Sequence, residues 1–120
     1  MRRDALYLRD IIEAAEAIQQ FVADCTRETL AANDLVRSAI LHKLTIIGEA
    51  AAHLSPELRA QYAEIEWADI VASRDIVVHA YFAVDWGIVW VAATQDVPAL
   101  HQQAVAILAH EFPSDAPPTN

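Results

Sequence analysis

The sequence is poor in the residues that make turns and crosslinks. Its 120 residues include two glycines, five prolines and one cysteine. A fold of many short strands needs turn residues at regular intervals, and this composition argues against one. The single cysteine, Cys25, excludes an internal disulfide. No run of about eighteen apolar residues is free of charge, which argues against a membrane-spanning helix.

Apolar helix formers are abundant instead. Hydrophobic residues make up 55% of the chain, and the length suits one domain that buries its own core. Since Ala, Leu, Ile and Val dominate while glycine and proline are scarce, long uninterrupted helices are expected. The composition therefore predicts an all-α protein.

The charge balance is strongly acidic. Seventeen acidic residues outnumber eight basic ones, which gives a formal net charge of -9. Because Lys and Arg supply most of the affinity for phosphates, indiscriminate binding of nucleic acid is not expected. Seven of the eight basic residues are arginines, the type suited to bidentate phosphate contacts, so a local basic site is still open.

The first ten residues, MRRDALYLRD, place the acidic residues Asp4 and Asp10 before any apolar run forms. This pattern is typical of neither a secretory signal nor a transit peptide. We expect a cytoplasmic protein.

Apolar residues recur at spacings of three and four along most of the chain. They predict helices over 4–23, 34–54, 66–84, 86–95 and 97–112, with short helical pieces after Thr26 and at 56–62. Pro98 is expected to break the chain of helices near residue 95. Together they predict an antiparallel four-helix bundle with additional short helices, a single domain over 1–112 and a flexible tail over 113–120.

Local signals mark several helix ends. Asp34, Ser55 and Asp85 have the side chains that cap helix N-termini, and Pro56 follows Ser55 at the first helical position. Gly48 lies inside a predicted helix, where it costs about 1 kcal/mol relative to Ala. A close approach by a neighbouring helix would compensate for it.

The stretch SRDIVVHAYF, residues 73–82, gathers Arg74, Asp75, His79 and Tyr81 inside an apolar segment. Arg74 and Tyr81 are seven residues apart and share one helical face, whereas His79 is about 140° round the helix from Arg74. Within one helix, Arg74 and His79 would flank a surface instead of forming a pair. Two copies packed around a two-fold axis would bring them together in one cleft.

This stretch closely resembles the R-x4-H-x-Y signature of the HEPN superfamily, and in particular its HepT-like toxins, through Arg74, His79 and Tyr81. The resemblance extends to RDALYLRDIIEAAEAI, IIGEAAAHLSPELRAQY and IEWADIVASRDIVVHAYFAVDWGIVW, and so covers nearly the whole chain. Where close relatives usually have Asn after the motif arginine, this chain has Asp75. A carboxylate there would partly neutralise Arg74.

The resemblance implies a toxin that cleaves RNA without a metal or other cofactor, leaving a 2′,3′-cyclic phosphate and a 5′-hydroxyl. It implies catalytic roles for Arg74 and His79 at a homodimer interface, with messenger or transfer RNA as the substrate. The chemistry agrees, because His79 can move a proton near neutral pH and Arg74 can stabilise charge on a phosphate. It also implies that a minimal nucleotidyltransferase antitoxin neutralises the toxin by attaching AMP to Tyr81.

Other interpretations of these residues remain open. Arg74 with Asp75 is commonly a surface ion pair, and His79 beside two valines is commonly a core histidine. A non-catalytic HEPN-type interaction or nucleotide-binding subunit, partnering a nucleotidyltransferase, is the alternative function.

A second polar set, His42, Glu49 and His53, lies along one side of the second long helix. A metal site is one interpretation, but the Glu-x-x-His pairs of di-iron bundles are missing. We expect Glu49 to support Arg74 or His79, and we expect partly exposed histidines. His101 and His110 are expected to be solvated. Arg2, Arg3, Arg9, Arg37 and Lys43 are expected to be surface residues, some of which would guide RNA.

Overall fold

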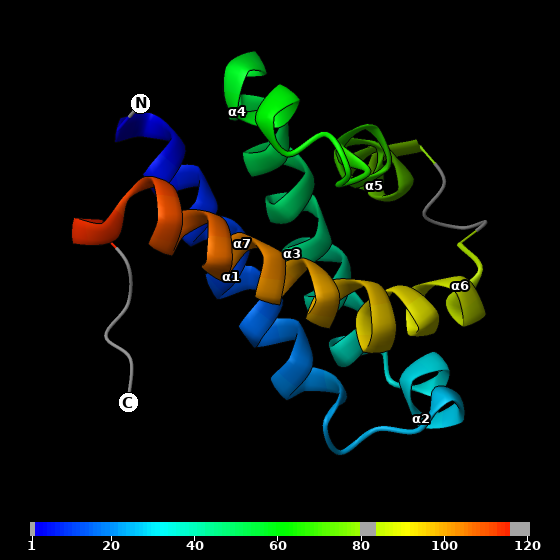
Figure 1. Cartoon of the computed structure of the whole chain (residues 1–120). Coiled ribbons are helices and arrows are strands. Elements are labelled where there is room, and N and C mark those ends of the chain that lie inside the picture. Colours follow the sequence, from blue (N-terminus) through cyan, green and yellow to red (C-terminus); the bar gives the residue numbers. More distant parts are fainter. Residues whose placement is uncertain (1, 80–83, 116–120) are drawn as a thin grey trace.

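The computed structural model describes residues 2–79 and 84–115, and the described residues form helices and no strand (Figure 1). The prediction of an all-α, HEPN-like fold is confirmed. The elements are α1 (Arg2–Val22), α2 (Arg27–Ala32), α3 (Asp34–His53), α4 (Pro56–Gln61), α5 (Trp67–His79), α6 (Trp86–Val91), a π-helical turn (Ala92–Asp96), α7 (Val97–Glu111) and a 3-10 turn (Pro113–Asp115).

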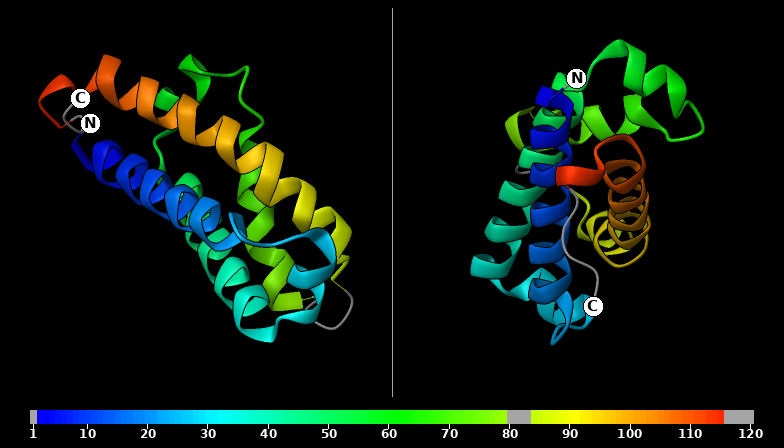
Figure 2. Two further views of the ribbon diagram at one scale, coloured as in Figure 1. Left: turned by 90° about the horizontal axis from the view of Figure 1, so that it is seen from below. Right: turned by 60° about the vertical axis from the view of Figure 1, so that its left-hand side comes forward.

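The centre of the molecule is the contact of α1 with α3 and α7. Figure 2 shows α1 and α3 side by side in opposite directions, with α7 packed on α1. Each helix turns one apolar stripe inward, as the spacing predicts. The stripes include Leu8, Ile11, Ala15 and Ile18 of α1, Ile40, Leu41, Ile47 and Ala51 of α3, and Leu100, Ala104, Ile107 and Leu108 of α7. These residues make one continuous core.

The short helices begin where the capping residues predict. Thr26 and Thr29 form a capping box at the start of α2. Ser55 Oγ accepts a hydrogen bond from Leu58 N at 3.2 Å at the start of α4, and Pro56 follows it. Asp85 Oδ1 accepts from Gly87 N at 2.9 Å at the start of α6. In α3 the cap is Asn33, one residue before the predicted Asp34, because Asn33 Oδ1 accepts from Val36 N.

The predicted break at Pro98 does not occur. Helix α6 continues through the π-helical turn into α7, and Val97 N donates to Ala92 O, five residues earlier. A proline inside a regular α-helix clashes with the carbonyl four residues before it. The wider π turn directly before Pro98 relieves this conflict, so one continuous rod replaces the two predicted helices, and α7 begins at Val97 as predicted.

Helix α5 packs on α3 through a position that only glycine fits. A Cβ atom at Gly48 would lie 2.9 Å from Arg74 Cβ and 3.0 Å from Arg74 N. Ser73 Oγ, beside Arg74, donates to Ile70 O at 2.7 Å and also reaches Leu44 O of α3 at 3.3 Å. The predicted close approach at Gly48 is therefore confirmed, and it places α5 against the C-terminal half of α3.

The structure revises other predicted boundaries. Val84 is not helical, so the predicted helix over 66–84 does not extend that far. Pro113–Asp115 form a 3-10 turn, and residues 116–120 lie outside the described ones, so the flexible tail over 113–120 stays a prediction. Among the described residues, no helix is both long enough and apolar enough to cross a bilayer.

Candidate functional site

Arg74 lies on α5 with its guanidinium against α3. Arg74 Nη1 donates to Glu49 Oε1 at 3.3 Å, and the two side chains are 35% and 51% exposed. Gly48, the residue before Glu49, contacts the Arg74 backbone and Cβ. The arginine is thus held at its base by packing and at its tip by a carboxylate, while a third of its surface is open to solvent.

The structure describes the other motif residues only in part. Asp75 is exposed and forms no ion pair with Arg74, because consecutive residues of a helix point in different directions. His79 is the last residue of α5, and its side chain lies outside the description. Tyr81 falls within 80–83, outside the described residues. The catalytic, supporting and modification roles predicted for these residues stay predictions.

Ser73 is the residue of this region that the sequence analysis missed. Its hydroxyl bonds carbonyls on both α5 and α3, which fixes the turn that carries Arg74. A serine inside an otherwise apolar helix, directly before the motif arginine, was the available signal.

The set of His42, Glu49 and His53 does not converge. His42 is exposed, and His53 Nδ1 lies 2.7 Å from the backbone oxygen of Glu49 while its ring stacks on Tyr7 at 5.2 Å. No group of three potential metal ligands occurs among the described residues. Glu49 contacts Arg74, one of the two residues that it was expected to support.

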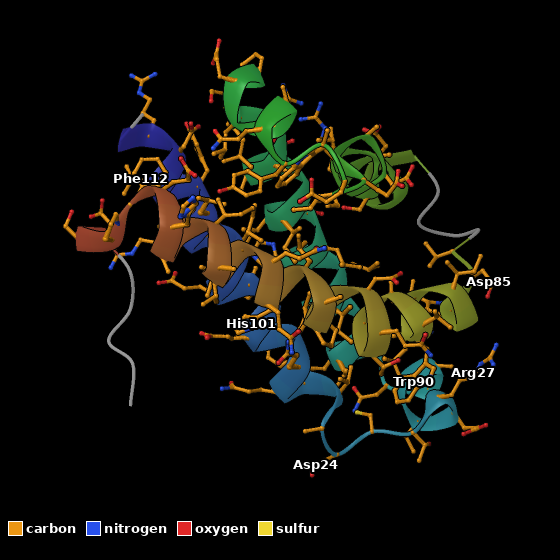
Figure 3. The ribbon with its side chains drawn as sticks, in the orientation of Figure 1. Asp24, Arg27, Asp85, Trp90, His101 and Phe112 are labelled. Atoms are coloured by element: carbon orange, nitrogen blue, oxygen red, sulfur yellow. The ribbon has the colours of Figure 1, made fainter. Side chains whose placement is uncertain are left out.

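The two histidines of α7 have acidic neighbours, and His110 is solvated as expected with a side chain 76% exposed, whereas that of His101 is only 23% exposed. His101, labelled in Figure 3, has its Nε2 3.0 Å from Glu16 Oε2 of α1. His110 Nε2 lies 3.6 Å from Glu111 Oε2. The His101 contact joins residues 85 positions apart, so helical spacing gave no sign of it. It ties the middle of α7 to α1.

The basic residues are dispersed. Arg3 and Arg9 are exposed on α1. Arg37 pairs with Asp34 at 3.2 Å and lies over the Trp86 ring at 5.2 Å, which joins the first turns of α3 and α6. Arg27, Asp85 and Trp90 lie at this same end of the molecule (Figure 3). Arg37 therefore has a structural role that the surface assignment did not include.

Comparison with known proteins identifies relatives along most of the chain. "Probable ribonuclease HepT" of Thermococcus cleftensis is 34% identical over 94 residues, covering 78% of this chain and 86% of the relative. "Putative RNase TTE0752" of Caldanaerobacter subterraneus subsp. tengcongensis is 30% identical over 111 residues, covering 92% and 99%.

A third relative is a longer protein. "Gamma-glutamylcyclotransferase and putative RNase MJ0434" of Methanocaldococcus jannaschii is 33% identical over 109 residues, which are 90% of this chain but 49% of the relative. The chain thus spans about half of that protein. No solved structure matches the chain. The family described as "Ribonuclease HepT-like" matches residues 11–107, a span that contains α3, α5 and the whole R-x4-H-x-Y motif, and the chain belongs to this HepT-like ribonuclease family.

Proposed function

We propose that the protein is a metal-independent endoribonuclease toxin acting in the cytoplasm on messenger or transfer RNA. The observation that carries the proposal is the placement of Arg74. It is fixed on α5 by Gly48 and Glu49, is partly open to solvent, and precedes the helix-terminal His79 by five residues, in a chain of the HepT-like ribonuclease family. The two relatives described above are named as ribonucleases, which supports RNA cleavage as the activity.

In the proposed reaction, a ribose 2′-oxygen attacks the adjacent phosphorus and the bond from phosphorus to the 5′-oxygen breaks. His79 of one copy removes the 2′-proton, and a second protonated group, the other copy's His79, gives a proton to the leaving 5′-oxygen. Arg74 donates N–H bonds to the phosphate oxygens as their negative charge grows. The products are a 2′,3′-cyclic phosphate and a 5′-hydroxyl.

The proposal requires two copies of the chain. Arg74 and His79 lie about 140° apart around α5, so one helix does not direct both at one phosphate. The sequence of α5 also has apolar residues at three consecutive positions, 76–78, and three consecutive positions of a helix do not share one stripe. A second copy of α5, related by a two-fold axis, would satisfy both requirements.

Regulation is proposed to act through Tyr81. A minimal nucleotidyltransferase antitoxin would transfer AMP to the Tyr81 hydroxyl from ATP, with release of pyrophosphate. The added negative charge and bulk, two residues from His79, would repel the RNA backbone.

Cleavage of a defined RNA in excess EDTA tests the nuclease. His79→Ala and Arg74→Ala are expected to abolish cleavage. His42→Ala and Arg27→Ala remove the same side chains at exposed positions and should cleave as the unmodified protein does. Equal cleavage by all five proteins would indicate a contaminating nuclease and leave the non-catalytic interaction module as the function.

Intact-mass measurement tests the regulation. The protein is coexpressed with a minimal nucleotidyltransferase, and AMP units are expected on the unmodified chain and on Tyr7→Phe but not on Tyr81→Phe. AMP that persists in Tyr81→Phe would place the modification elsewhere, without affecting the nuclease result.

A further inference from the structure

A groove of about 400 Å³ opens between α5 and α7, with α3 as its floor. Ser73 lines it, whereas Arg74 and Glu49 do not, so it is separate from the Arg74 site. It is lined by Leu44, Ile47, Glu64, Ile65, Glu66, Asp69, Ile70, Ser73, Ala92, Asp96, Val97, Ala99, Leu100 and Gln103.

The floor of the groove is apolar. Leu44 and Ile47 of α3, Ile70 of α5 and Leu100 of α7 contribute to it. In the described part of the chain, α5 packs mainly on α3 and α7 mainly on α1, which leaves room for a further element between α5 and α7. Because sites of ~300–1,000 Å³ enclose ligands of drug size, this groove has space for a few side chains.

The rim of the groove is acidic. Glu64, Glu66 and Asp69 line it at the start of α5, and Asp96 lines it on the opposite side, at the π turn; all four residues are exposed. None of the four forms an ion pair with a basic side chain of the described chain. Their mutual repulsion would be relieved by cationic groups placed over the groove.

We propose that this groove binds a basic amphipathic helix of a partner protein. The partner's apolar residues would lie on the floor, and Lys or Arg side chains beside them would pair with the four carboxylates. This is the helix-in-groove mode of recognition, with charge complementarity setting orientation and specificity. A second copy of this chain is a poor occupant of this groove, because a chain with seventeen acidic and eight basic residues offers few cations to pair with the four carboxylates.

A synthetic helix measures the binding directly on the full chain, independently of any nuclease activity. The probe is a fluorescein-labelled peptide of about eighteen residues, with Leu at helical spacings of three and four and Lys on both flanks of the Leu stripe. We expect fluorescence anisotropy to show saturable binding. The same peptide with Glu in place of Lys should not bind, and lack of binding by the Lys peptide overturns the proposal.

Filling the groove distinguishes this site from the rest of the surface. Ala99 lines the groove and Ala106 does not, although both are exposed on α7. Ala99→Trp is expected to weaken peptide binding by about tenfold or more, and Ala106→Trp by less than about twofold. Equal effects of the two substitutions would overturn the proposal.

Charge variants distinguish the rim from general attraction to an acidic protein. One variant combines Glu64→Gln, Glu66→Gln, Asp69→Asn and Asp96→Asn. Its control neutralises four exposed residues outside the groove, Asp10→Asn, Glu13→Gln, Asp24→Asn and Glu28→Gln. Both raise the formal net charge by four, from -9 to -5. We expect about a tenfold loss of affinity for the rim variant and less than about a threefold loss for the control.

An equal loss in both charge variants would mean non-specific electrostatic attraction. Light scattering completes the test, because Ala99→Trp should leave the number of copies per particle unchanged. A lower number would identify a second copy of the chain as the occupant. Either result overturns the proposal.

Discussion

Gly48 of α3 and Arg74 of α5 approach so closely that a Cβ atom at residue 48 would lie 2.9 Å from Arg74 Cβ. The contact is with a Cβ and a backbone nitrogen, neither of which can rotate away. The position of the motif arginine is therefore tied to a missing side chain on a neighbouring helix.

Overpacking at Gly48→Ala is expected to cost about 1–3 kcal/mol, because it forces α5 to move. Helix propensity offsets about 1 kcal/mol of this cost, so the net destabilisation is expected to be up to about 2 kcal/mol. Urea unfolding measures the change, and RNA cleavage should fall with it. Gly87→Ala is the control, since its Cβ would meet mainly the flexible Arg27 side chain, and its cost should stay below that of Gly48→Ala.

Glu49→Gln is expected to lower the rate of RNA cleavage by about tenfold, because the Arg74 guanidinium would lose the carboxylate that positions it. Misplacing a reacting group can lower a rate by up to ~100-fold. Stability should change by no more than about 1 kcal/mol, because the ion pair with Arg74 is exposed. Cleavage kinetics and urea unfolding separate the two effects. Asp34→Asn breaks the exposed pair with Arg37 instead, and unchanged cleavage is expected. Matching losses in both variants would refute a positioning role for Glu49.

Asp4→Ala is expected to destabilise the protein by about 2–4 kcal/mol. Asp4 is 3% exposed, and its carboxylate accepts hydrogen bonds from Ser55 N at 2.9 Å and Ser55 Oγ at 2.7 Å. Its removal leaves these donors without their acceptor in a partly buried place. Ser55→Ala, which retains the backbone donor, should cost about 1 kcal/mol. Thermal unfolding that ranks the two variants the other way would contradict this account.

The free energy of unfolding is expected to fall as the pH rises from about 10 to about 12. The hydrogen bond from Tyr62 to Glu111, together with burial, raises the pKa of Tyr62 to about 12. A group that holds its proton more tightly when folded stabilises the fold below its unfolded pKa of 10.0 and loses that contribution above it.

Tyr62→Phe should lack this part of the alkaline decline, and at pH 8 it should be less stable by about 1 kcal/mol. Urea unfolding between pH 8 and pH 12 provides the comparison. Tyr7→Phe serves as the control, and parallel curves for all three proteins would show that the Glu111 contact has no such effect.

Local chemistry was sufficient for much of the fold. Ser55 with Pro56, and Asp85, marked helix starts because capping depends on neighbours a few residues away. Gly48 indicated tight helix packing, since an interior glycine needs compensation. The motif arginine and its acidic partner Glu49 were also among the residues singled out in the sequence.

Features that depend on distant residues were missed. The contacts of Asp4 with Ser55 and of His101 with Glu16 join positions 51 and 85 residues apart. Helical periodicity describes which face a residue occupies and not what lies opposite. The break at Pro98 was predicted from a rule for regular α-helices, and the π turn satisfies proline in another way.

The π turn at Ala92–Asp96 also sets the phase of the rod to which it belongs. It holds one residue more than a regular turn, because each of its residues advances the chain by a smaller angle about the rod axis. Deleting a single alanine there would restore an ordinary α-helix and leave α6 in nearly the same rotational position, with Trp86 still at the Arg37 guanidinium. Homologous chains that are one residue shorter at this place can therefore keep the same contact between their first-turn aromatic residue and α3.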